Sequence, residues 1–261
     1  MSFTQGVLLK VSTPLLGMSM IGAILALVIA GLLLVRRLIP QHRLKLHHDV
    51  AGPIFGTVGV IYAVLLAFVF VVVWEDFERA DMNVEKEANC LLDIYRDAEA
   101  FPPDLKEKVR SLAKEYASVA STDEWESIAM GKTSPNLTAV LDKFWTLYAG
   151  YSPRLENEKI FYAESLRNLN ALGELRSTRL VDSKTGVHPL LWFVLVSGGV
   201  ITIAFCFFFG AENLNSQIVM TALLTLLISL IIFTILLFDF PFTGGVRISA
   251  KAFQELLLHQ H

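Results

Sequence analysis

The chain has 261 residues, of which 54% are hydrophobic and 18% are charged, and its net charge is −3. A soluble domain is usually ~45–50% apolar and ~25% charged, so this composition points to a membrane protein. The slightly negative charge gives no support to nucleic-acid binding, and we expect no nucleic-acid partner.

Four long stretches almost lack charged residues. Each is close to the ~20 residues that a helix needs to cross a ~30 Å hydrocarbon core, and all are too uniformly apolar for ordinary core helices. They cover residues 15–35, 53–74, 189–210 and 218–238. We therefore predict an all-α membrane protein with four transmembrane helices in the lipid bilayer, two in residues 1–74 and two in residues 189–261, before a C-terminal tail.

Small residues recur at four-residue spacing in these stretches. Gly52 and Gly56 open the second, and Gly198 and Thr202 lie in the third. Such spacing lets helix backbones approach closely in lipid. The residues are predicted helix-packing positions, within or between subunits; the alternative is that small residues are simply common in such helices.

The second apolar stretch continues into an amphipathic helix that ends at Pro102-Pro103. Within the second apolar stretch, Phe55, Tyr62 and Val69 recur every seven residues and are candidates to line a pore. The alternative is contact with lipid or other helices. Three acids, Glu75, Asp76 and Glu78, follow directly and are candidates for a pore mouth.

Residues 75–188 read as an extramembrane helical bundle that continues from the second span. Start signals for further helices stand at Ser134-Pro135 and Ser152-Pro153, and Thr122 or Asp123 is a predicted N-cap for a short helix with Trp125. The stretch holds 15 Lys/Arg against 21 Asp/Glu, so its balance is −6.

Positive charges at the span ends give a divided signal on orientation. Arg36, Arg37, Arg43 and Lys45 follow the first span, which favours a cytoplasmic first loop and an extracytoplasmic central domain. Other cations, however, lie on the opposite side, near span ends: Arg79, Lys86, Arg176, Arg179, Lys184, Arg247 and Lys251.

Asp239 ends the fourth span, where an acid is costly unless it is paired or hydrated. Arg176 and Arg179, three residues apart on one helix face, and Arg247 are its predicted partners in a surface ion pair, the alternative being a hydrated interfacial acid.

No cofactor or metal is expected. The sequence contains no common catalytic or nucleotide-binding motif, so we expect the chain not to be an enzyme. The cluster His42, His47, His48 and Asp49 is better explained as a basic loop facing lipid headgroups than as a metal site.

Several stretches resemble a bacterial and plant membrane family known as bestrophin-like. They are YAVLLAFVFVVVWEDFERADMNVEKEA (62–88), RSTRL (176–180), HPLLW (188–192) and DFPFTGGVRIS (239–249). Bestrophins are pentameric ion channels with a pore lined mainly by their second span, and the resemblance implies that arrangement here.

The leading hypothesis is thus a homo-oligomeric channel of the cytoplasmic membrane for inorganic ions, cation-preferring because of its mouth acids. The alternative is a non-conducting membrane protein whose helical domain senses or binds a partner.

Overall fold

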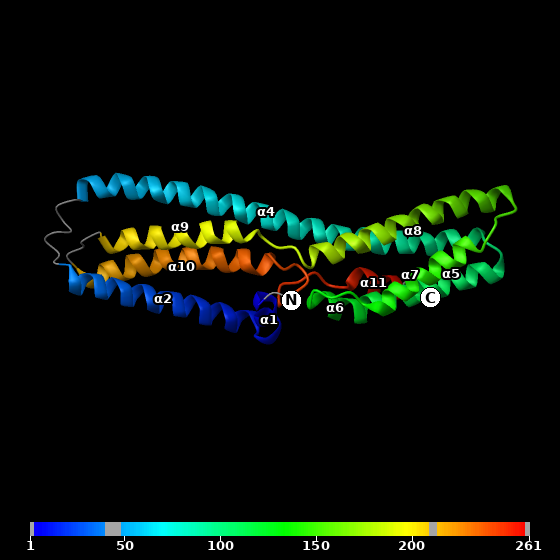
Figure 1. The fold of residues 1–261 in the computed structure, drawn as a ribbon, viewed down its shortest axis with the longest axis horizontal. Coiled ribbons are helices and arrows are strands. Elements are labelled where there is room, and N and C mark those ends of the chain that lie inside the picture. Colours follow the sequence, from blue (N-terminus) through cyan, green and yellow to red (C-terminus); the bar gives the residue numbers. More distant parts are fainter. Residues whose placement is uncertain (1–2, 40–47, 209–212, 259–261) are drawn as a thin grey trace. The chain divides into compact units, whose positions relative to one another are not determined.

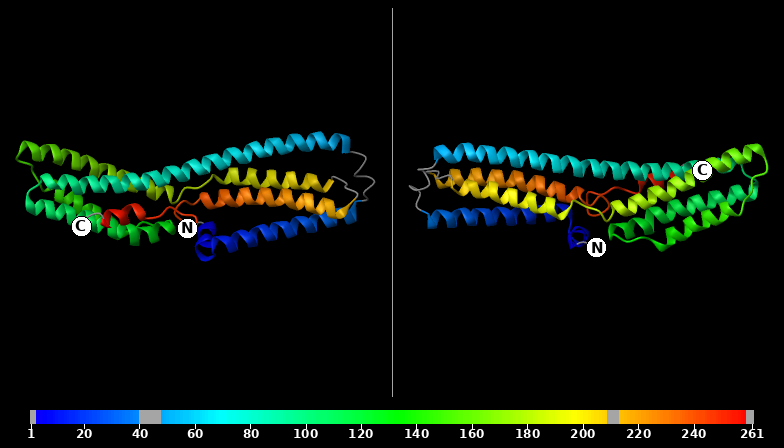
Figure 2. Two further views of the ribbon diagram at one scale, coloured as in Figure 1. Left: turned by 180° about the vertical axis from the view of Figure 1, so that it is seen from behind. Right: turned by 45° about the horizontal axis from the view of Figure 1, so that its top comes forward.

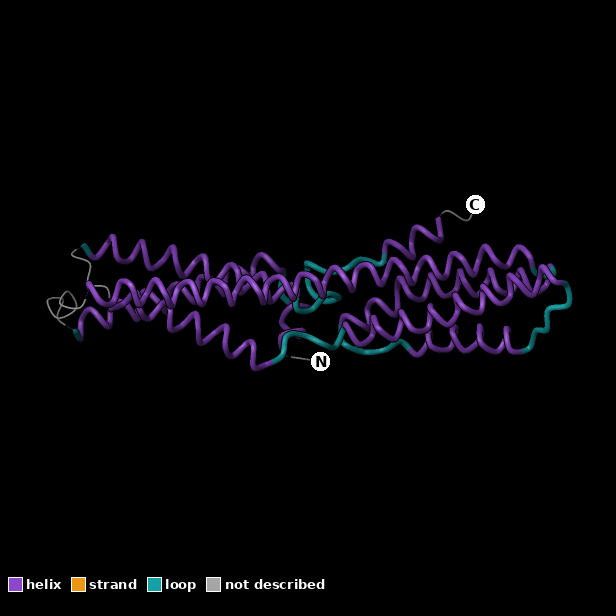
Figure 3. The backbone as a smooth tube through the Cα atoms, turned by 90° about the horizontal axis from the view of Figure 1, so that it is seen from above, coloured by secondary structure: helices purple, strands orange, loops and turns teal. Residues whose placement is uncertain are grey.

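A computed structural model of the chain describes residues 3–39, 48–208 and 213–258, and every regular element in these ranges is helical (Figures 1 and 3). The predicted all-α class is confirmed. The elements are α1 (Phe3–Lys10), α2 (Thr13–Leu38), α4 (His48–Asp97), the 3₁₀ turn η1 (Ala98–Ala100), α5 (Pro103–Val119), the π-helix η2 (Ala120–Glu124), α6 (Trp125–Ala129), α7 (Pro135–Ala149), α8 (Glu156–Asp182), α9 (Pro189–Phe208), α10 (Leu214–Phe238) and α11 (Lys251–Leu258).

One compact unit, the spanning unit, consists of residues 11–76 and 186–239. Within the described residues, four helices are long and apolar enough to cross a membrane: α2, α4, α9 and α10. In the two views of Figure 2, α9 and α10 run side by side. The apolar core between the helices includes Tyr62, Val69, Leu195, Ile228 and Ile235.

The second unit, the helical domain, consists of residues 1–10, 77–185 and 240–261. Val84 and Leu91 on α4 and Ala98 at the start of η1, which recur every seven residues, are buried in its core together with residues of α5, α7, α8 and α11. The periodicity of the sequence thus gives the buried face of α4 directly.

Both described ends of the chain belong to the helical domain, whereas the division made from the sequence grouped them with the spans. On α1, the Gln5 side-chain amide donates to the carbonyl oxygen of Ser183 at 3.1 Å. On α11, Phe253 is fully buried, with its ring 6.3 Å from that of Tyr116. Neither docking has a signature that can be read from local sequence.

The predicted helix starts agree with the structure in part. Ser134 caps α7, and its hydroxyl accepts from the backbone N–H of Leu137 at 3.3 Å. The predicted cap at Thr122 or Asp123 is wrong, because the chain continues without a break from α5 through η2 into α6. The Thr122 hydroxyl instead donates to the carbonyl of Ser118, one turn back in the same helix, at 2.8 Å.

Candidate functional site

Tyr62 is the side chain that fixes α4 in the spanning unit. It is 5% exposed, and its hydroxyl donates to the carbonyl oxygen of Leu195 on α9 at 2.9 Å. Its ring lies against Gly198, where an added Cβ would come within 2.6 Å of it. The glycine therefore provides the space that the tyrosine ring fills.

The predicted pore-lining stripe consequently faces into the protomer. Val69 is 7% exposed and belongs to the same core as Tyr62, and the Phe55 ring lies 6.2 Å from that of Phe205 on α9. Within the protomer, the seven-residue spacing of this stripe reflects packing of α4 on α9 and α10, and its assignment to a pore wall stays a prediction.

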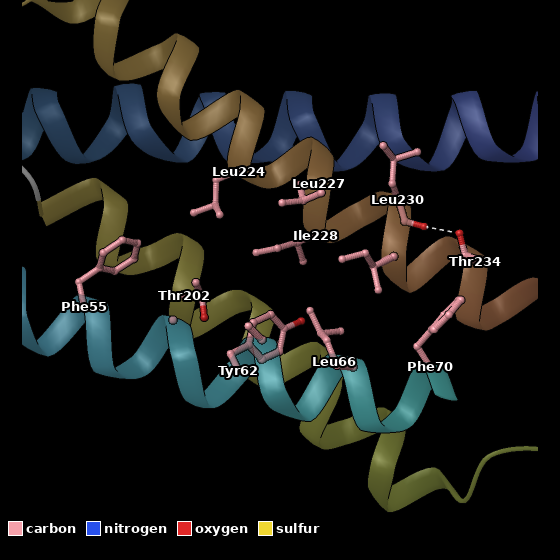
Figure 4. A pocket seen from close by; sticks show the side chains of 14 residues that line it. Phe55, Tyr62, Leu66, Phe70, Thr202, Leu224, Leu227, Ile228, Leu230 and Thr234 are labelled. Atoms are coloured by element: carbon pink, nitrogen blue, oxygen red, sulfur yellow. Dashed lines mark hydrogen bonds between the residues drawn. The ribbon is translucent and has the colours of Figure 1, made fainter. Parts of the chain in front are cut away.

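An apolar cavity of about 590 Å³ lies beside this stripe, between α4, α9 and α10 (Figure 4). Three hydroxyl groups line it, and each is bonded to a backbone carbonyl. Tyr62 donates to Leu195, Thr202 donates to Gly198 at 2.8 Å, and Thr234 donates to Leu230 at 2.9 Å. The protons of these hydroxyl groups are thus not available to an anion, and the rest of the cavity wall is apolar.

The opposite face of α4 is uncovered. Val64, Phe68 and Val71 are 50%, 68% and 48% exposed, and their spacing of four and three residues places them on one face, about half a turn from Tyr62. Glu75 continues the same face four residues after Val71, and it is exposed. This apolar stripe therefore leads directly to an acid.

All three predicted mouth acids lie on α4 and are exposed. By helical register, Glu75 lies within about 20° of Phe68, whereas Asp76 and Glu78 each lie about 80° from it, on opposite sides. The register thus separates Glu75 from the other two acids.

The predicted helix-packing residues also fall into two groups. Gly198 contacts Tyr62, and the neighbouring Thr202 is 3% exposed in the core. Gly52 and Gly56, in contrast, have nothing within 4 Å of an added Cβ. Within the described protomer, this second pair packs against no other helix.

Asp239 does not pair with the predicted arginines. It is 6% exposed at the end of α10, accepts from the backbone N–H of Val187, and accepts from the Trp192 indole at 3.3 Å. An added Cβ at Gly186 would lie 2.9 Å from its Oδ1 atom, so glycine allows the close approach. Burial raises the pKa of Asp239, while the two donors oppose that shift.

Arg176 and Arg179 form a buried ion network in the helical domain instead of a surface pair with Asp239. The Arg179 Nε atom lies 2.7 Å from Glu87 Oε2, and both side chains are fully buried. Arg176 Nε lies 3.1 Å from Glu124 Oε1. Each arginine forms an ion pair with a carboxylate of its own unit, so neither arginine pairs with Asp239. The fourth predicted member, Arg247, is exposed.

Neutral groups also take part in this network. The Tyr116 hydroxyl donates to Glu87 at 2.7 Å, and the Ser134 backbone N–H donates to Glu124 at 2.9 Å. The Arg179 guanidinium lies 5.1 Å from the ring centre of Trp125. Burial raises the pKa of Tyr116 well above its usual value, and the neighbouring Glu87 carboxylate raises it further.

Glu87 and Glu124 were not among the residues predicted from the sequence. Glu124 ends the π-helix η2, a type of bulge that is frequent at functional sites and that here directs the carboxylate inward. Glu87 occupies an inward position of the α4 pattern, three residues after Val84 and four before Leu91. A carboxylate in an apolar stripe was the signal that could have identified it.

Among the described residues, no group of three or more His, Cys, Asp and Glu side chains is arranged to hold a metal. The side chains of the histidine-rich cluster, His42, His47, His48 and Asp49, lie outside the described set.

Comparisons with known proteins define the family. A crystal structure of a variant of a bacterial bestrophin homologue from Klebsiella pneumoniae matches with a TM-score of 0.69 and 13% identity, over 91% of this chain and 97% of that chain. A second variant of that homologue gives 0.60 and 14%, over 90% and 96%. No curated protein gives a significant match. The family model of the bestrophin-like domain matches residues 22–253, and the chain therefore belongs to the bestrophin-like family.

Proposed function

We propose that the chain assembles into homo-oligomers that conduct inorganic ions, with a preference for cations, along a path lined by the uncovered face of α4. The observation that carries the proposal is the run Val64, Phe68, Val71 and Glu75, which is exposed on the protomer and ends in a carboxylate. An apolar stripe of this kind, followed by an acid, suits a narrow pore with a charged mouth.

Several copies are needed for such a path. The interior of the spanning unit is lined mainly by apolar side chains, and the wall of the cavity beside Tyr62 is almost entirely apolar. A path between copies would instead use surface that one protomer leaves open. The resemblance to bestrophins suggests five copies.

The preference for cations follows from local electrostatics. In an oligomer around α4, each copy adds Glu75 to a ring, and Glu78 lies one turn further along the helix. A ring of carboxylates raises the local concentration of cations. The preference should weaken with salt, because the screening length decreases from ~10 Å at 0.1 M to ~3 Å at 1 M.

The test is the reversal potential of purified protein in planar bilayers under a KCl gradient. Glu75→Gln with Asp76→Asn should shift the potential toward the unselective value, and Glu75→Gln alone should give most of that shift because Asp76 lies to the side. Asp104→Asn, which removes an exposed carboxylate from α5, is the matched control. Anion preference in the wild type, or an unchanged potential in the double variant, would refute the mouth assignment.

Oligomer mass in detergent is measured in parallel. A well-folded oligomer without conductance would favour the alternative, a membrane-anchored sensor or scaffold. We keep the expectation of a cytoplasmic-membrane location with the helical domain outside the cytoplasm. A reporter that is active only in the cytoplasm, fused at residue 130, should therefore be inactive.

A further inference from the structure

A hollow of about 760 Å³ on the helical domain is lined by three cationic side chains of α5. Lys106, Arg110 and Lys114 follow one another at four-residue spacing, so they share one face of the helix. The surrounding stretch, residues 75–188, is acidic overall, with 15 Lys/Arg against 21 Asp/Glu. Three cations in one hollow therefore stand out against the charge of the domain.

Tyr95 of α4 holds two of these cations in place. The Arg110 guanidinium carbon lies 4.6 Å from the centre of the Tyr95 ring, and the Lys114 Nζ atom lies 5.9 Å from it. Arg110 Nε also donates to the Tyr95 carbonyl oxygen at 3.4 Å. Contacts with a ring face orient the cations without consuming all their hydrogen-bond donors.

A carboxylate of the same chain already occupies part of the hollow. Both Lys106 Nζ and Arg110 Nη2 lie 2.6 Å from oxygens of Glu99, whose side chain is 64% exposed. The two cations converge on one oxyanion, as they would on a ligand. Because Glu99 is mostly in solvent, the pair contributes little stability and is easily exchanged.

We propose that this hollow binds a phosphate group and that Glu99 competes with it as an internal anion. A guanidinium fork and two ammonium groups match the several oxygens of a phosphate, and a dianion gains more from them than a carboxylate does. Glu107 also lines the hollow and lowers the affinity, but the cations outnumber the two carboxylates.

The phosphate group can come from a free phosphate or from a phospholipid headgroup. The probes are therefore inorganic phosphate and glycerophosphoglycerol, a headgroup without acyl chains. Each is titrated by calorimetry into the full-length protein in detergent. Binding of inorganic phosphate supports a free ligand, and binding of the diester alone supports a headgroup. Absence of binding by both probes, in wild type and in Glu99→Gln, overturns the proposal.

Two variants should change the affinity in opposite directions. Lys106→Gln with Lys114→Gln should weaken binding about tenfold, and Glu99→Gln should strengthen it several-fold because the competing carboxylate is lost. Lys132→Gln with Lys184→Gln removes two exposed charges outside the hollow and should leave the affinity unchanged. Equal weakening by the control pair, or no gain from Glu99→Gln, would show non-specific charge attraction and contradict the site.

Discussion

Arg179 is a fully buried cation whose partners all belong to the helical domain. It lies between Glu87 and Glu124, with Nη2 3.8 Å from the Glu124 Oε1 atom, and thereby connects α4, η2 and α8. Burying two ions is costly, so such a pair adds specificity of packing more than net stability. The network should therefore act as a constraint on how these helices meet.

Removing Arg179 alone should be severely destabilising. Arg179→Met leaves Glu87 buried without its cation, and we expect the free energy of unfolding to decrease by about 3–5 kcal/mol. Denaturant unfolding in detergent, followed by tryptophan fluorescence, measures the change. Adding Glu87→Leu should recover part of the loss, because no charge of that pair then remains buried.

An exposed pair with the same separation is the control. Lys143 and Glu115 also lie 2.7 Å apart, but their side chains are 55% and 40% exposed. Lys143→Met should cost less than about 1 kcal/mol. If both arginine and lysine variants cost the same, burial would not be the cause.

Glu158 makes the stability of the helical domain depend on pH. Its Oε2 atom accepts from the backbone N–H of Arg154 and from the Tyr151 hydroxyl, each at 2.9 Å. These bonds, with that from Arg154 as the largest cause, lower its pKa below the ordinary 4.5. The stabilisation is therefore fully present above pH 4.5 and is lost as the pH falls through the lowered pKa of the folded state.

Glu158→Gln should flatten this part of the stability profile. Unfolding midpoints measured between pH 3 and 6 should decrease on acidification less steeply in the variant than in the wild type. Glu156→Gln, which removes an exposed carboxylate from the same turn, should keep the wild-type slope. Identical slopes for all three proteins would rule out Glu158 as the source.

At the scale of elements, Gly198 and Gly56 show that small residues at four-residue spacing can either pack against a neighbouring helix of the protomer or leave a helix face open. Gly198→Val would force the Tyr62 ring to move, and with it the bond to Leu195, so we expect a loss of about 1–3 kcal/mol in unfolding free energy. Gly56→Val meets no neighbour in the protomer and should leave that value unchanged.

The two variants should differ again in oligomer mass. Replacement of Gly56, like that of Gly52, should reduce the assembled fraction if these residues pack between copies. Light scattering in detergent measures it. A stable, fully assembled Gly56→Val protein would remove this glycine pair from the account of assembly.

Helix positions were predictable because their determinants are local. The break at Pro102-Pro103 and the cap at Ser134 act within one turn, so the long helix ends and α7 begins close to where the sequence places them. The continuation of α5 through the π-helix into α6 was not predictable, because that segment contains Thr122 and Asp123, which resemble a helix cap although the chain does not break there.

The pairing of charges was beyond the sequence. Glu124 lies 52 positions from Arg176, and Glu87 lies 92 from Arg179. Helical register gives the direction of each side chain but not the element it meets. For the same reason, the stripe through Tyr62 was recognised, but the surface that it contacts was not. An apolar side chain suits a protomer core, lipid or a pore wall equally well.

At the scale of the whole molecule, the two units use different means to fix their helices. The helical domain buries charged groups and must pair every one, whereas the spanning unit relies on close fit, as at Tyr62 and Gly198, and on hydroxyls bonded within their own helix. In the helical domain, water competes for the hydrogen bonds of the buried groups. In the spanning unit, lipid offers no competing hydrogen bonds. If the chain conducts ions as proposed, the path would depend on the surfaces that the protomer leaves uncovered.

Phe68 is the side chain on which that dependence can be tested. It is 68% exposed on the protomer, and in an oligomer around α4 its rings would form an apolar constriction that excludes water. Phe68→Ser should widen and wet the constriction, so single-channel conductance in planar bilayers should increase. Cation preference should remain, because Glu75 is unchanged.

Val69→Ser is the matched control, one residue further along the same helix. Val69 is 7% exposed in the core of the spanning unit, so its replacement should lower the unfolding midpoint without changing the conductance of channels that still open. If conductance increases in Val69→Ser, or does not increase in Phe68→Ser, the path lies along the other face of α4. Because the two residues lie about 100° apart on one helix, the pair distinguishes the faces without changing the length or charge of the span.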